Sequence, residues 1–133
     1  MTVDEGGLRS EVITFFDDFV TAFRTFDGGE VARRYIAPYV ALHADGSLAC
    51  LTSQADIAQV FQQVVNAYHA EGCRSCRYHG LHVQLLGARS LLATVTWELL
   101  RGDGSVLKEW RESYNPACVA DGWRIFASVD HVA

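Results

Sequence analysis

The sequence predicts an α+β domain in which three helices pack on the concave face of a strongly curved antiparallel sheet. Apolar residues at helical spacing are confined to the first half of the chain, whereas apolar alternation of period two fills the second half. Helices segregated from consecutive antiparallel strands are typical of this class. Long neighbouring strands twist and coil, so we expect a cone-shaped space between the helices and a four-stranded C-terminal meander.

Length and composition fit a single domain spanning residues 1–133. The formal net charge of −5, with scattered lysines and arginines, argues against a nucleic-acid partner. No apolar run reaches the ~18 residues of a membrane span, and the polar start MTVDEGG does not resemble a signal peptide. We therefore expect a cytoplasmic protein without a membrane partner, whose four cysteines are free thiols.

Three helices are expected before residue 73. The first begins near Leu8 and ends before Gly28-Gly29. A second, short helix is capped by Asp27 and ended by Pro38. A third is capped by Thr52 or Ser53 and ends at Gly72. An apolar stripe on one side of the first helix consists of Val12, Phe16, Phe19, Phe23 and Phe26.

Short strands are expected at 39–43 and 48–51, and longer ones at 75–86, 90–101, 106–118 and 122–132. The Asp103-Gly104 pair predicts a tight hairpin between the second and third of the long strands. The favoured register pairs Trp97 with Trp110, Val95 with Glu112, Ala93 with Tyr114 and Glu98 with Glu109. A slip of one residue would instead turn Arg111 toward the helices.

Several local patterns together resemble the fold shared by nuclear transport factor 2, the ketosteroid isomerases, the scytalone dehydratases and the SnoaL-like polyketide cyclases. The patterns are the first helix running into Asp27-Gly28-Gly29, the strand at 40–43, Thr52-Ser53 opening a long helix, the segment 95–99 before an Asp-Gly turn, and the closing segment 121–125. The resemblance covers about residues 12–131. It implies the fold more strongly than any chemistry, because this fold hosts unrelated activities.

Matched to the isomerases, the general-base aspartate falls on His43 and the oxyanion tyrosine of the first helix falls on Phe19. The second oxyanion donor falls near Tyr114. Phe19 cannot donate a hydrogen bond, so half of that oxyanion hole is missing and steroid isomerisation is not expected. The resemblance also implies that Trp123, Ile125, Ala127, Val129 and His131 share the side of the last strand that faces the helices.

These placements define a candidate site inside the cone. The candidate catalytic residues are His43 as a base, Glu112, and Tyr114 to stabilise negative charge. The candidate ligand-binding residues are Phe16, Phe19, Phe23, Tyr35, Phe61, Val95, Trp97, Trp110, Ile125, Ala127 and His131.

Structural roles are the alternatives for these polar residues. Glu112 would form an ion pair with an arginine such as Arg33, Arg34 or Arg77. His43 would be a polar residue at a strand end whose hydrogen-bonding groups already have partners. His131 lies two residues from the C-terminus and would be frayed there.

Cys73, Cys76, His79 and His82 follow a C-x2-C-x2-H-x2-H spacing. On a regular strand, residues three apart point to opposite faces, so His79 and His82 should diverge. A zinc finger also needs about 12 residues between its ligand pairs. We therefore expect no metal site and no cofactor in this chain, including at this motif. The sequence gives little support for a redox role of Cys73 and Cys76. Reactive pairs gain thiolate character at a helix N-terminus, whereas this pair follows a helix C-terminus.

Three functions fit this sequence. The first is a domain that binds a small apolar ligand in an aromatic-lined pocket. The second is an acid–base enzyme, such as an isomerase, cyclase or dehydratase, on a small apolar substrate. The third is a dimerisation module whose rings fill the cone. Binding ranks first because no catalytic set is complete. A homodimer is expected through the outer sheet face, which carries Thr94, Thr96, Glu98, Glu109, Arg111 and Ser113.

Overall fold

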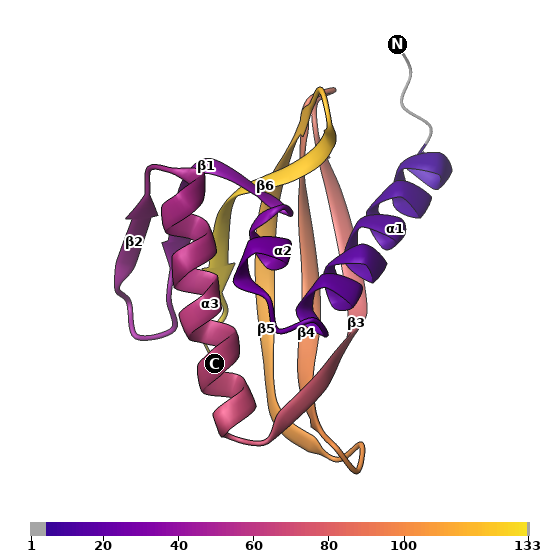
Figure 1. Ribbon diagram of the computed structural model, residues 1–133. Coiled ribbons are helices and arrows are strands. Elements are labelled where there is room, and N and C mark those ends of the chain that lie inside the picture. Colours follow the sequence, from indigo (N-terminus) through magenta and orange to yellow (C-terminus); the bar gives the residue numbers. More distant parts are fainter. Residues whose placement is uncertain (1–4, 133) are drawn as a thin grey trace.

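The computed structural model describes residues 5–132, which form three helices and a six-stranded sheet (Figure 1). The helices are α1 (Glu5–Phe23), α2 (Gly28–Ala32) and α3 (Gln54–Ala70). The strands are β1 (Tyr35–Leu42), β2 (Leu48–Leu51), β3 (Cys73–Leu86), β4 (Ser90–Arg101), β5 (Val106–Val119) and β6 (Gly122–Asp130). The helices lie together on one side of the curved sheet, which confirms the predicted α+β class. Within residues 5–132, no helix combines the length and apolar character needed to cross a bilayer.

The predicted C-terminal meander is confirmed, because β3, β4, β5 and β6 pair antiparallel in sequence order. The short strands join it through its last strand, which gives the order β2-β1-β6-β5-β4-β3. Here β1 runs parallel to β6, with Val40 beside Ala127 and Leu42 beside Val129. The sheet is therefore mixed rather than wholly antiparallel, and the β1–β2 hairpin extends it beneath α3.

The helix α1 buries the expected stripe, including Val12, Phe16, Phe19 and Phe23. It ends at Phe23, earlier than predicted, because the chain turns there and Phe26 adopts a positive φ of 51°. The stripe packs over the sheet, and Phe16 lies 6.1 Å from Trp97 between ring centroids.

Pro38 does not end a helix as predicted, because α2 already stops at Ala32 and Pro38 lies inside β1. A proline cannot donate to a strand ladder, and it is tolerated where pairing is irregular. The β1–β6 register shifts between Tyr35 and Val40, which brackets Pro38.

The Gly28-Gly29 pair begins α2 rather than merely ending α1. Asp27 caps this helix as predicted and accepts a 2.8 Å hydrogen bond from the Gly29 amide. The Gly28 amide donates to the Gln62 side chain of α3 at 2.7 Å. A Cβ at Gly28 would lie 2.3 Å from the Gln62 backbone nitrogen. Only glycine allows α2 to approach α3 this closely.

The predicted hairpin register is confirmed. Trp97 pairs with Trp110, Val95 with Glu112, Ala93 with Tyr114 and Glu98 with Glu109. Since side chains alternate between the faces of a strand, Glu112 rather than Arg111 points toward the helices.

The predicted alternation in the last strand is wrong beyond Ile125. On β5, Asn115 and Pro116 are consecutive, but their partners on β6 are Ala127 and Ile125. One extra residue, Phe126, therefore bulges from β6, and a bulge exchanges the faces of the residues that follow. As a result Ser128 and Asp130, rather than Ala127, Val129 and His131, turn toward the helix side of the sheet.

Candidate functional site

A cavity of about 300 Å³ lies between α3, the end of α1 and the concave face of the sheet. Helix α3 contributes Phe61 and Tyr68, and α1 contributes Phe19 and Phe23. Aromatic side chains from α1, α3 and several strands dominate the lining. They are Phe19, Phe23, Tyr35, Tyr39, Phe61, Tyr68, Trp97, Trp110 and Tyr114. Such a lining suits an apolar molecule.

The structure brings most of the predicted ligand-binding residues to this cavity. The ones that line it are Phe19, Phe23, Tyr35, Phe61, Trp97, Trp110 and His131. Phe16, Val95 and Ile125 are instead fully buried in the core behind the cavity wall. Ala127 is half-buried and does not line the cavity, because it follows the bulge in β6.

Polar groups gather at one side of the cavity. Glu112 on β5 lies directly opposite Asp130 on β6, and both carboxyl groups line the cavity. Close by, the Tyr39 hydroxyl and the Ser128 hydroxyl share a 2.5 Å hydrogen bond. Sequence reasoning missed Asp130, Ser128 and Tyr39, because regular alternation placed the first two on the outer face.

Glu112 is the most perturbed carboxyl group in this arrangement. Burial raises its pKa to about 8, and the neighbouring charge of Asp130 adds to the increase. The Trp110 indole Nε1 donates a 2.9 Å hydrogen bond to Glu112 Oε1, which acts in the opposite direction by favouring the carboxylate. Glu112 therefore carries a proton at neutral pH and can donate it in a hydrogen bond to Asp130. An acid in this state can also donate to, or protonate, a bound molecule.

The alternative in which an arginine neutralises Glu112 does not describe this site. Arg77 pairs with Glu98 on the outer face, and Arg33 lies 3.6 Å from Glu30. Trp110 provides the neutral donor instead. Among residues 5–132, no cation forms an ion pair with Glu112. Its proton can therefore be donated either to Asp130 or to a molecule in the cavity.

His43 lies at the mouth of the cavity, just after β1. Its side chain is 50% exposed, and Nδ1 is 3.9 Å from Asp130 Oδ2. Its backbone is fixed by the turn to β2, where its amide donates to Ser47 at 2.9 Å. The imidazole therefore faces solvent on one side and the Asp130 carboxyl group on the other.

Tyr114 is buried and its hydroxyl accepts a 2.7 Å hydrogen bond from the Trp97 indole. Burial raises the pKa of Tyr114 well above its usual value, so the phenol stays protonated. Tyr114 also neighbours Glu112 and acts to lower the pKa of that carboxyl group. The phenol is therefore a link between Trp97 and Glu112.

His131 lines the rim of the cavity, but its ring points away. Nε2 hydrogen-bonds the Ser113 hydroxyl at 2.7 Å, and that hydroxyl also bonds Thr94 on the outer face. The bulge in β6 explains this orientation. Pro116 is the one signal in the sequence that could have predicted it, because a proline inside a strand is usually found at an edge or next to a bulge.

The Cys-His motif separates onto two faces of the sheet. Cys73 and Cys76 are buried, and burial raises the pKa of Cys76 to about 12, so this thiol is inert. His79 and His82 are both exposed and pair with Thr96 and Thr94. The predicted divergence of the two histidines is wrong, because β3 bulges at Gly80, where φ is +66°. The four side chains do not converge.

The sequence profile of a family described as NTF2-like protein (DUF6841) matches residues 10–133. No curated protein matches the chain.

Solved structures with similar folds include Aln2 from a Streptomyces species, with a TM-score of 0.75 and 16% identity over 98% of this chain and 94% of that chain. An NTF2-like protein with a cystatin-like fold from Novosphingobium aromaticivorans has a TM-score of 0.72 and 16% identity, covering 92% and 79% of the two chains. A ketosteroid isomerase-like protein from Erwinia carotovora atroseptica has a TM-score of 0.65 and 17% identity, covering 93% and 96%. These similarities confirm the fold resemblance and concern the fold alone.

Proposed function

Because the chain belongs to the NTF2-like protein family DUF6841, we propose that it is a small-molecule-binding domain that holds an apolar ligand in the cavity beneath α3. The observation that carries this proposal is a hollow of about 300 Å³ lined by nine aromatic residues with a few polar groups at one side. Ligand sites are typically concave, mostly apolar and supplied with a few placed polar groups. A dimerisation module without a ligand would have no need of such a hollow.

The polar side of the cavity restricts the ligand further. A protonated Glu112 is a hydrogen-bond donor in an apolar environment, so it favours a neutral acceptor such as a ketone or ester carbonyl. An anionic ligand group would meet Asp130 and is disfavoured there. The expected ligand is therefore a compact, neutral, mostly hydrocarbon molecule with one carbonyl group.

A thermal-shift comparison of 2-tetralone with the matched hydrocarbon tetralin tests this preference. Binding to the folded state raises Tm, and we expect a larger rise with the ketone. Glu112→Gln keeps a donor in place, whereas Glu112→Leu removes it and should equalise the two shifts. Equal shifts in the unaltered protein would contradict the carbonyl preference, and the absence of any shift with either compound would contradict the binding role.

A second candidate function is acid–base catalysis on such a ligand. It is favoured by one observation, the Glu112–Asp130 carboxyl pair with the pKa of Glu112 near 8. A proton-transfer group works best when its pKa is close to the working pH. In this version Glu112 and Asp130 exchange a proton with the substrate, and His43, 3.9 Å from Asp130, relays it to solvent.

Deuterium exchange at the carbons next to the carbonyl of 2-tetralone, followed by NMR in D2O, tests this candidate. An enzyme should accelerate the exchange by at least about a hundredfold over buffer, as general acid–base catalysis typically does. Glu112→Gln and Asp130→Asn should abolish the acceleration, and His43→Gln should reduce it. Binding without accelerated exchange would leave the ligand-binding role intact and reject catalysis.

We also propose a cytoplasmic location, where reducing conditions keep thiols free. The support is that Cys50 and Cys118 are exposed and unpaired, and that Cys73 and Cys76 are buried and unpaired. Thiol titration of the denatured protein, isolated from its host without reductant, should find all four cysteines reactive.

A further inference from the structure

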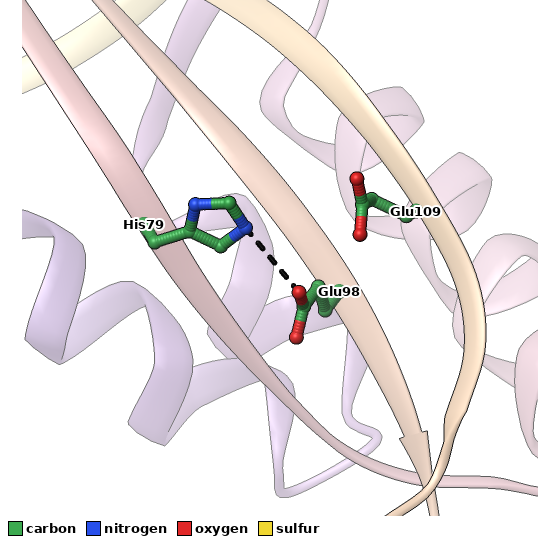
Figure 2. Close-up of side chains that lie close together, drawn as sticks. All are labelled: His79, Glu98 and Glu109. Carbon is green, nitrogen blue, oxygen red and sulfur yellow. Dashed lines mark ion pairs between the residues drawn. The ribbon is translucent and has the colours of Figure 1, made fainter.

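Three potential metal ligands converge on the outer face of the sheet, away from the cavity (Figure 2). They are His79 on β3, Glu98 on β4 and Glu109 on β5. One ligand atom from each lies within 4.8 Å of the other two. Figure 2 shows the three side chains pointing toward one another from adjacent strands.

The strand register fixes this convergence. Glu98 is directly opposite Glu109, and Arg77 is directly opposite Glu98. His79 is two residues from Arg77 on β3 and therefore lies on the same face, diagonal to Glu98. All three positions belong to hydrogen-bonded strands, so the backbone holds them without a flexible loop.

The charges around Glu98 and Glu109 are unbalanced. Like charges directly opposite each other on a sheet are destabilising. Arg77 hydrogen-bonds Glu98 Oε2, and His79 Nε2 lies 3.3 Å from Glu98 Oε1. Within residues 5–132, no ion pair joins a cation to Glu109. A cation between the three side chains would remove the repulsion between the two glutamates.

We propose that His79, Glu98 and Glu109 bind a divalent transition-metal ion, with Zn²⁺ the best match. One imidazole nitrogen and two carboxylate oxygens are ligands that Zn²⁺ accepts at about 2.0–2.2 Å. The ion would be coordinated by His79 Nε2, Glu98 Oε1 and one carboxylate oxygen of Glu109, and water would complete its coordination. Arg77 would retain its hydrogen bond to Glu98 Oε2 and would so orient the Glu98 carboxylate, as outer-shell partners of metal sites do.

The environment allows the ion to enter. The His79 side chain is 56% exposed, whereas that of Glu98 is only 11% exposed. In the single chain, a buried carboxylate between two exposed ligands gives a site that is partly shielded from water and still open to solvent. The buried thiols of Cys73 and Cys76 take no part in it.

Isothermal titration of the metal-stripped protein with ZnCl2 tests the site. Cys50 and Cys118 are exposed and could bind Zn²⁺ themselves, so the titration uses a background carrying Cys50→Ser and Cys118→Ser. We expect one Zn²⁺ per chain. His79→Ala and the near-isosteric Glu109→Gln should each weaken binding by at least about tenfold, the scale seen when metal-site residues are altered.

His82→Ala and Glu71→Gln are matched controls, because both residues are exposed and neither belongs to the cluster. Both control variants should bind Zn²⁺ as the background protein does. The proposal is overturned if no Zn²⁺ binds at millimolar concentration, or if His79→Ala and Glu109→Gln bind it as tightly as the controls. Circular dichroism of every variant establishes that each is folded.

Discussion

Glu112 on β5 and Asp130 on β6 lie directly opposite each other and present two carboxyl groups to a cavity lined mainly by aromatic rings. Two like charges cannot both ionise at low cost in such a place. The pair therefore retains a proton near neutral pH, chiefly because Glu112 is buried. This proton is the one that Glu112 would donate to a bound ligand. It also makes the stability of the folded protein depend on pH.

The free energy of unfolding should fall as pH rises from about 5 to about 8. The pKa of Glu112 is about 8 in the folded protein and near 4.5 when unperturbed. In this window the folded state holds a proton that the unfolded state has released, so stabilisation present at low pH is lost as pH rises through 8. The expected slope from this group is roughly 1 kcal/mol per pH unit. Urea denaturation at several pH values measures it.

Glu112→Gln cannot titrate, yet its amide oxygen can still accept from Trp110. The slope should therefore flatten in Glu112→Gln and persist in Glu71→Gln, which alters an exposed carboxyl. An unchanged slope in Glu112→Gln would mean that this carboxyl is ionised throughout the window.

Tyr39 and Ser128 should behave as a coupled pair. Both are buried, and their hydroxyls hydrogen-bond each other at 2.5 Å. Tyr39→Phe or Ser128→Ala alone leaves one buried hydroxyl without its partner, which costs about 1–3 kcal/mol. The double variant removes both groups and should cost less than the sum of the single variants. Denaturation of the four proteins measures the coupling, and simple additivity would contradict the observed contact.

Gly28→Ala should destabilise the protein by at least about 2 kcal/mol, because overpacking forces the backbone apart. The added Cβ would meet the Gln62 nitrogen at 2.3 Å and the Ala58 carbonyl at 2.5 Å. Gly29→Ala is the matched control, since its nearest neighbour is the Asp27 side chain at 3.2 Å. Thermal and urea denaturation compare the two variants. Equal stability would show that α2 can move away from α3 at little cost.

Pairing through the outer sheet face remains a proposal. Light scattering should give about twice the 14.7 kDa mass of one chain. Thr96→Arg places a second cation beside Arg111, which hydrogen-bonds Thr96 at 3.0 Å, and should dissociate the dimer. Gln63→Arg adds the same charge on an exposed position of α3 and should not. A monomeric unaltered protein would contradict this proposal.

The sequence predicted most of the fold because its signals were local. The alternation from Leu91 to Leu99 and the Asp103-Gly104 turn indicated the hairpin but allowed a slip of one residue. The register that keeps Trp97 and Trp110 together on the apolar face was the favoured one, and it is the register observed. The buried side of α1 was also predicted correctly, because apolar residues at helical spacing identify the face of a helix that packs against the core.

The site was only partly predictable, because two bulges interrupt the alternation on which the assignments depend. The extra residue in β6 brought Asp130 into the cavity and turned His131 to Ser113. The bulge at Gly80 placed His79 and His82 on one face. Pro116 indicates that a bulge is near, but pairing between distant strands decides which strand carries the extra residue and where that residue lies.

The most direct test of the central claim is a fluorescence titration with the neutral apolar probe N-phenyl-1-naphthylamine. Val64 on α3 lines the cavity, so Val64→Phe should fill part of the hollow, whereas Val106→Phe adds the same bulk at an exposed position outside it. We predict saturable binding to the unaltered protein and to Val106→Phe, weakened at least about tenfold in Val64→Phe. Absence of saturable binding, or equal binding by both phenylalanine variants, would contradict a ligand-holding cavity beneath α3.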